Sequence, residues 1–153
     1  MCAVLFAESV WAVEDSVTLR SATDRLLRAY SAKDLSAVEK MLDSDILILG
    51  SDISERADSR VKVRELLEAD FALWKGANFG EAIYTSQRIG GELGTVACDV
   101  PFSMRRAGDK VDTVVVRFLF VWRRVVDDWR LTQCMSAVPT VGQSAREILQ
   151  RGD

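Results

Sequence analysis

The stretch VDTVVVRFLFVWRR, residues 111–124, decides the fold class of this chain. Aliphatic and aromatic residues fill every position from Val114 to Trp122 except Arg117. Such a density of β-branched and aromatic residues is typical of a strand, whose side chains alternate between two faces. A buried guanidinium without a partner is very costly. Arg117 therefore either points to solvent from a strand with one wet face, or points inward and meets another group.

Further runs of β-forming residues flank this stretch. They lie at about 78–89, 94–106 and 128–138, and they are separated by Gly90-Gly91, Ala107-Gly108-Asp109 and Asp127-Asp128. Glycine and aspartate are turn residues, so the pattern predicts a meander of long antiparallel strands in the second half of the chain.

The first half of the chain has helical spacing instead. A single apolar stripe predicts a helix over 17–31, and Asp34 is placed to cap a short helix over 35–42. A short apolar strand, DILILGS at 45–51, and a polar loop follow. A third helix is predicted over 59–75, with Trp74 at its end.

The order of these elements predicts one α+β domain, with helices packed on one face of a curved antiparallel sheet. The 153 residues contain no linker and no internal repeat, so we assign 1–153 to a single domain. Its core is expected at about 17–139, with an N-terminal extension at 1–16 and a C-terminal tail at 140–153. The apolar extension is interpreted as a docking helix or strand. The alternative is the remnant of a targeting segment, although a basic n-region is missing.

Composition excludes several classes of function. The net charge of −3 gives no basic footprint for nucleic acid, and no apolar run approaches the roughly 18 residues of a membrane helix. Histidine is absent, which removes Ser-His and Cys-His nucleophiles and imidazole ligands. Cys2, Cys98 and Cys134 form no C-x-x-C pair, which favours a reducing, cytoplasmic setting. We expect no nucleic-acid or membrane partner, no metal and no other cofactor.

Four phrases occur in a recognisable order: AYSAKDLSAVEKMLDSDILILGS, SRVKVRELLEADFALW, VVVRFLFVWRR and WRLTQCMSAVP. Together they resemble the nuclear transport factor 2-like (NTF2-like) superfamily, which includes ketosteroid isomerase and the SnoaL-like polyketide cyclases. The resemblance covers about 17–139. It implies a cone-shaped, cystatin-like α+β barrel, in which a curved antiparallel sheet and helices enclose one deep pocket. Relatives use that pocket for isomerisation, cyclisation, dehydration, epoxide hydrolysis or binding, so the fold does not settle the function.

The resemblance also carries expectations for single residues. It places the isomerase base, an aspartate just after the first strand, at Asp52. The two isomerase oxyanion donors fall on Leu26 and Val121, which cannot donate, and the last-strand histidine of many SnoaL-like relatives falls on Cys134. The resemblance therefore implies a pocket protein other than a steroid isomerase with the usual oxyanion hole.

If Val121 faces the pocket, strand alternation places Arg117 and Leu119 on the pocket side. The opposite side, with Phe118, Phe120 and Trp122, then needs a cover. In relatives that cover is often another subunit, so a homodimer is expected.

Asp99 is a lone charge in the preceding apolar run, and counting from the turn at 107–110 pairs it near residue 118. Asp99 and Arg117 form either the polar floor of the pocket or a structural ion pair.

These placements predict carboxylate-based proton transfer on an apolar, carbonyl-bearing small molecule. Asp52 acts as base, Arg117 stabilises the oxyanion and Asp99 orients Arg117. An epoxide hydrolase with an Asp-Arg-Asp cluster uses the same residue types. The competing hypothesis is a non-catalytic ligand-binding or dimerisation domain. The predicted ligand-binding residues are Tyr30, Trp74, Phe102, Leu119, Val121 and Cys134, of which Trp74 and Cys134 are also ordinary candidates for the core.

Overall fold

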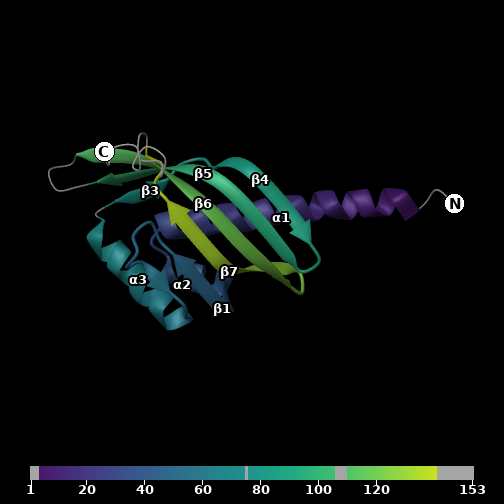
Figure 1. Cartoon of the computed structure of the whole chain (residues 1–153), viewed down its shortest axis with the longest axis horizontal. Coiled ribbons are helices and arrows are strands. Elements are labelled where there is room, and N and C mark those ends of the chain that lie inside the picture. The colour runs from purple at the N-terminus through teal and green to yellow at the C-terminus, as the bar shows by residue number, and fades with distance from the viewer. Residues whose placement is uncertain (1–3, 75, 106–109, 141–153) are drawn as a thin grey trace, which may run out of the picture.

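A computed structural model describes residues 4–74, 76–105 and 110–140 of the chain (Figure 1). Its elements, in chain order, are α1 (Val4–Ser31), α2 (Leu35–Met41), β1 (Leu42–Leu49), β2 (Arg56–Ala57), α3 (Arg60–Leu73), β3 (Ala77–Phe79), β4 (Ile83–Gly90), β5 (Leu93–Arg105), β6 (Val111–Val125) and β7 (Asp128–Ala137). The predicted α+β class and the element order of the second half are confirmed.

The strands form one curved sheet in the order β2-β1-β7-β6-β5-β3, with β4 also paired to β5. All neighbours are antiparallel except β1 and β7, which are parallel. Figure 1 shows the sheet curving over α1, with α2 and α3 near β1. The predicted turn at 107–109 lies outside the described residues.

The predicted strand over 78–89 is in fact two strands. Phe79 pairs with Phe102 and Ile83 pairs with Asp99, so the break faces Pro101 on β5. Proline has no backbone N–H to give to a neighbouring strand. A continuous ladder is therefore interrupted at this point.

The helix caps agree with the sequence. The Asp34 side chain accepts from the backbone N of Ala37 at 2.9 Å and begins α2, and Ser59 caps α3 in the same way. By contrast, α1 begins at Val4 instead of near residue 17. Part of the predicted N-terminal extension thus continues α1, and Figure 1 shows this end of the helix reaching beyond the sheet.

The core lies between the sheet and the helices. On β6, Phe118, Phe120 and Trp122 are buried on the face that the helices cover, which we call the inner face. Arg117 and Leu119 point to the other side, the outer face. The predicted assignment of the two faces was therefore inverted, and no second subunit is needed to cover the aromatic residues.

A glycine sets the spacing between α1 and the sheet. A Cβ atom at Gly94 would lie 2.8 Å from Leu19 Cδ2, closer than carbon atoms approach. Leu19 itself is fully buried. Glycine at position 94 therefore allows α1 to pack directly on the inner face of β5.

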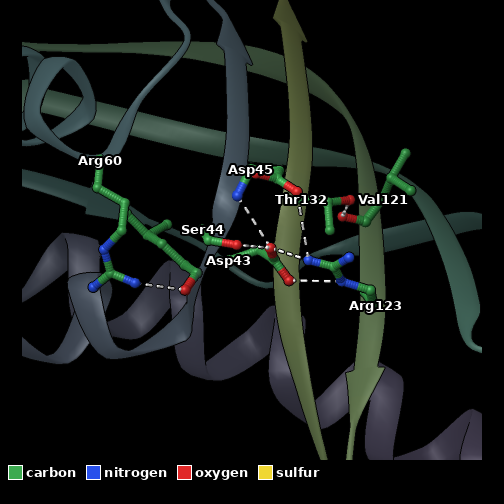
Figure 2. A network of polar contacts seen from close by, with 8 residues as sticks. Asp43, Ser44, Asp45, Arg60, Val121, Arg123 and Thr132 are labelled. Atoms are coloured by element: carbon green, nitrogen blue, oxygen red, sulfur yellow. Dashed lines mark hydrogen bonds and ion pairs between the residues drawn. The ribbon is translucent and has the colours of Figure 1, made fainter.

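One buried carboxylate links β1 to β6, across the strand β7 that lies between them (Figure 2). Arg123 on β6 reaches past β7 to Asp43 on β1, donating from Nε to Oδ2 at 2.9 Å and from Nη2 to Oδ1. Ser44 Oγ and the backbone N of Asp45 also donate to Asp43. Burial raises the pKa of Asp43, but these hydrogen bonds outweigh it and leave the pKa below its ordinary value. The network holds β1 where its register with β7 shifts.

Candidate functional site

A cavity of about 270 Å³ lies between the inner face of the sheet and the helices. This volume is near the lower end of the range for small-molecule pockets. Most of its wall is apolar. The aliphatic part of the wall comes mainly from the helices and β1, and includes Leu26, Leu27, Val38, Leu42, Ile48, Val63 and Leu67.

The other part of the wall is aromatic. Phe79 lies 4.7 Å from Phe102 and 5.5 Å from Phe118, measured between ring centroids, and Trp74 meets Phe102 edge to face at 6.4 Å. Phe120 stacks on Phe118 at 5.0 Å. These residues line the cavity. Offset and edge-to-face contacts fix ring positions, so the aromatic wall is well ordered.

Two polar side chains from different helices meet in this apolar setting. Tyr30 lies near the end of α1 and Asp70 in the last turn of α3, and both line the cavity. Tyr30 Oη donates to Asp70 Oδ2 at 2.9 Å. The ring of Tyr30 packs on Phe71 and Phe79 at 5.2 and 5.1 Å between ring centroids, which fixes the position of the hydroxyl oxygen.

The environment shifts both pKa values upward. Burial, then the charge of Asp70 and the hydrogen bond to it, raise the pKa of Tyr30 far above its ordinary value, so the phenol keeps its proton. Burial raises the pKa of Asp70, the hydrogen bond from Tyr30 opposes this, and the charge of Glu55 adds to it. A carboxylate with a raised pKa in a cleft is a candidate acid–base group.

Glu55 borders the cavity from the loop between β1 and β2. Its Oε2 accepts from the backbone N of Asp52 at 3.1 Å and from Ser51 Oγ at 3.3 Å. A Cβ at Gly50 would lie 2.2 Å from the same oxygen and 2.4 Å from Glu55 Cβ, so a larger residue at position 50 would displace the Glu55 side chain. The loop thus holds the Glu55 carboxylate at the cavity.

The wall of the cavity formed by β7 carries Cys134 and Ser136. Burial, with a smaller effect of Cys98, raises the pKa of Cys134 to about 12. A thiol of this kind stays protonated near neutral pH and is a poor nucleophile. Cys134 therefore contributes shape to the cavity wall.

Asp99 and Arg117 pair as predicted from register, but on the outer face. They are direct cross-strand partners, and Arg117 Nε and Nη2 donate to the two carboxylate oxygens of Asp99, each at 2.8 Å. The side chain of Arg117 is 60% exposed and neither residue lines the cavity. The observed partner of Asp99 lies one residue from the position that counting gave. The expected face of Arg117 was wrong because it was inferred from a pocket position at Val121, and Val121 does not line the cavity.

Asp52 also lies away from the cavity. It is exposed in the loop after β1, where its Oδ1 accepts from Ser54 N at 2.8 Å and Ser54 Oγ at 2.6 Å. These hydrogen bonds lower the pKa of Asp52. The three predicted catalytic side chains are therefore not brought together, and the Asp-Arg-Asp arrangement of an epoxide hydrolase is not formed.

The predicted ligand-binding residues divide in the same way. Tyr30, Trp74, Phe102 and Cys134 line the cavity, whereas Leu119 and Val121 lie on the opposite side of β6.

Sequence reasoning missed Asp70 and Glu55. A usable signal for Asp70 existed, because it follows Leu67 by three residues and precedes Trp74 by four, within the apolar stripe of α3. No comparable periodicity marks Glu55 in its loop.

Within the described residues, no helix is long and apolar enough to cross a membrane. The same part of the chain contains no cluster of three or more cysteine, aspartate or glutamate side chains suited to a metal ion.

The chain belongs to the SnoaL-like domain family, whose model matches residues 19–140. A search of curated proteins gave no match. The family assignment and the predicted NTF2-like resemblance are thus confirmed.

Solved structures share the fold at low identity. An NTF2-like protein with a cystatin-like fold from Novosphingobium aromaticivorans is 18% identical over 97% of each chain, with a TM-score of 0.75. A ketosteroid isomerase-like protein from Erwinia carotovora atroseptica is 15% identical over 83% of this chain and 98% of its own, with a TM-score of 0.72. An NTF2-like superfamily protein from Salmonella enterica serovar Typhimurium is 14% identical over 88% and 99%, with a TM-score of 0.71. These likenesses confirm the predicted cone-shaped fold.

Proposed function

We propose that this chain binds an apolar, carbonyl-bearing small molecule in its cavity and that Asp70 and Tyr30 carry out carboxylate-based proton transfer on it. One observation carries the proposal: Tyr30 Oη donates to Asp70 Oδ2 at 2.9 Å inside an apolar cavity. The reaction type is the one that the sequence predicts. We assign the base to Asp70 instead of Asp52, because Asp70 lines the cavity.

The pair supports a balanced proton transfer. Asp70 accepts a proton from the carbon next to the carbonyl group. The electron pair of the broken C–H bond forms the C=C bond of an enolate, and the π pair of the carbonyl group moves to its oxygen. Once protonated, Asp70 is a weaker acceptor, so the hydroxyl group of Tyr30 can turn to the new oxyanion. Return of the proton to carbon completes the cycle. The raised pKa of Asp70 brings the base closer to neutral pH, where general base catalysis is most effective.

The test is hydrogen–deuterium exchange of β-tetralone, an apolar bicyclic ketone, in heavy water followed by NMR. We expect the protein to accelerate exchange over buffer, Asp70→Asn to abolish the acceleration and Tyr30→Phe to reduce it. Glu65→Gln, on the exposed side of the same helix, is the control and keeps the parent rate. Acceleration that survives Asp70→Asn contradicts the proposed base.

A second candidate is non-catalytic binding, and one observation favours it. No lysine or arginine is among the described residues that line the cavity, so an enolate would meet no cationic side chain there. Binding of β-tetralone without accelerated exchange selects this candidate over the enzyme.

A homodimer was expected as the cover for Phe118, Phe120 and Trp122, which the helices bury instead, so we now base the proposed homodimer on the outer face of the sheet. Val115, Leu119 and Met135 are 45–48% exposed there, around the Arg117–Asp99 pair. Exposed apolar residues of this kind favour association. Sedimentation equilibrium is expected to give a dimer that Leu119→Asp converts to a monomer. A parent chain that stays monomeric at all concentrations contradicts this proposal.

A cytoplasmic setting remains a prediction from the cysteine pattern. Cys98 and Cys134 are free and buried, and Cys2 lies outside the described residues. Cell fractionation with an antibody to the chain tests it.

A further inference from the structure

The cavity holds acidic groups without a basic one. Asp70 and Glu55 are its acidic residues, and the other polar side chains among its described lining residues are the hydroxyl groups of Tyr30, Ser51 and Ser136, the indole N–H of Trp74 and the buried thiol of Cys134. Two carboxylates near each other repel and both gain from a cation placed close to them. The effect of this repulsion is already present, because the charge of Glu55 contributes to the raised pKa of Asp70.

Two of the hydroxyl donors in the cavity are already engaged within the protein. The hydroxyl group of Tyr30 is committed to Asp70, and Ser51 Oγ donates to Glu55. Asp70 Oδ2 and Glu55 Oε2 are the oxygens that these groups occupy, which leaves the second oxygen of each carboxylate for a ligand. A ligand with N–H donors satisfies them, whereas a ligand carboxylate faces like charges.

The aromatic wall adds to this preference. The faces of Trp74, Phe79 and Phe102 carry the negative part of the ring quadrupole, which attracts a cation within about 6 Å of a ring centroid. Aromatic faces together with carboxylates are a common way to hold an ammonium group in a site that remains apolar.

A cation of the protein itself lies at this end of the molecule but is engaged elsewhere. Lys33 Nζ donates to the backbone oxygen of Phe71 at 2.6 Å and to that of Trp74, at the end of α3. Lys33 is not among the residues that line the cavity. Its ammonium group therefore stabilises the end of the helix rather than neutralising the cavity.

From these observations we propose that the cavity selects an aromatic or otherwise apolar amine, bound as its ammonium ion beside Glu55 and Asp70. This inference rests on the binding part of the proposed function, because it adds an amino group to the apolar ligand of the same cavity, and it is independent of the proposed proton transfer. The apolar body of the amine lies against the aromatic wall, and its ammonium group donates to the free carboxylate oxygens.

The experiment compares three probes with the same aromatic body: naphthylethylamine, naphthylethanol and naphthylacetate. Affinities are measured by calorimetry at about pH 8, where the amine is protonated and carboxylates are ionised. We expect the amine to bind at least about tenfold more tightly than the alcohol, and the carboxylate to bind more weakly than either. Naphthylethanol should displace the amine, which shows that both use one cavity.

Two variants test whether Asp70 and Glu55 cause the preference for the amine. Asp70→Asn and Glu55→Gln each keep a hydrogen-bond acceptor of similar shape, and each is expected to lower the amine-over-alcohol ratio by about threefold or more. Glu65→Gln is the matched control, because it removes an exposed carboxylate of α3 and should leave the ratio unchanged. Circular dichroism of each variant shows whether it is folded, and either variant alone is sufficient for the comparison.

The outcomes separate this inference from the proposed function. The cation preference is wrong if naphthylethanol or naphthylacetate binds as tightly as the amine. It is also wrong if the amine-over-alcohol affinity ratio is the same in both variants as in the parent. In either case the cavity remains a binding site. If none of the three binds, both the inference and the proposed binding function fail. Catalysis is judged separately, on the uncharged β-tetralone.

Discussion

The two faces of β6 carry opposite kinds of side chain within one strand. Phe118, Phe120 and Trp122 point inward and are at most 9% exposed, whereas Leu119 is 45% exposed and Arg117 pairs with Asp99 on the outer face. A charge in an apolar run therefore marks the wet face of the strand here, and not the cavity. The polar groups of the cavity come from helices α1 and α3 and from a loop.

Two aspartates show what the difference between the faces means chemically. Hydrogen bonds from Arg117 lower the pKa of Asp99, which stays ionised and inert on the outer face. Burial raises the pKa of Asp70 in the cavity. An acid that is stabilised as a carboxylate is a structural partner, whereas an acid that is held closer to its titration point is available for proton transfer.

Shortening one side chain on each face of β6 tests this comparison. Phe120→Ala removes a ring that is 1% exposed and is expected to lower the free energy of unfolding by about 3–5 kcal/mol. Leu119→Ala, next in the chain, should cost less than about 1 kcal/mol in the monomer. Urea denaturation measures both. Equal losses would show that the outer face is buried too.

The next largest loss of stability is expected when the hydrogen-bond network of Asp43 (Figure 2) is broken. Asp43 is 4% exposed, and Asp43→Ala strands its hydrogen-bond donors, so we expect a loss of about 2–3 kcal/mol in the free energy of unfolding. Asp45→Ala is the matched control. That side chain is 84% exposed, and its removal should change stability by less than about 0.5 kcal/mol. A small effect at Asp43 would show that the network does not anchor β1.

The pH dependence of stability should have opposite signs for Asp70 and Asp43. The folded-state pKa of Asp70 lies above the ordinary value of 3.8, so its contribution to stability is present below that pH and is lost as pH rises through the folded-state pKa. Asp70→Asn should therefore raise the Tm at neutral pH relative to the parent, with the gain disappearing in acid.

Asp43 has a folded-state pKa below 3.8, so its contribution is present above that pH and is lost as pH falls through the folded-state pKa. Asp43→Asn should lower the Tm at neutral pH, with a smaller difference in acid. Thermal denaturation between neutral pH and about pH 3 checks both signs. Parallel curves for the two variants would contradict the assignment.

The smallest effect is expected at the residue that the sequence singles out. Arg117→Ala breaks an exposed pair, so the Tm should fall only slightly, and Asp99→Asn should reproduce that change. Neither variant should alter the affinity for naphthylethylamine, measured by calorimetry. A large loss of ligand affinity would show that Arg117 takes part in ligand binding.

The sequence was sufficient for the fold and for part of the cavity. Strand periodicity, turn residues and the Asp34 cap are local signals, and they predicted the order of β4 to β7 and the helices. The pairing of Asp99 with Arg117 followed from counting, to within one residue. The face of the sheet on which Arg117 lies was harder to predict, because an alignment error of one residue places every side chain of a strand on the opposite face.

The prediction of the catalytic residues was wrong for a related reason. The position of the base was transferred from a family pattern to Asp52, whereas burial and the contact with Tyr30 depend on how α1 and α3 meet in space. That packing has no local signature beyond the helical spacing of Leu67, Asp70 and Trp74. The role of Glu55 depends on a loop conformation in which its side chain packs directly on Gly50.

The most direct test of the central claim, that the inner cavity and not the outer ion pair is the functional site, is an NMR titration of the labelled protein with naphthylethylamine. The account predicts shifts at the indole N–H of Trp74 and at the backbone amides of Tyr30, Asp70 and Phe118, with the Nε–H signal of Arg117 unchanged. Shifts confined to Arg117 Nε–H and to amides of the outer face, such as that of Asp99, would contradict it.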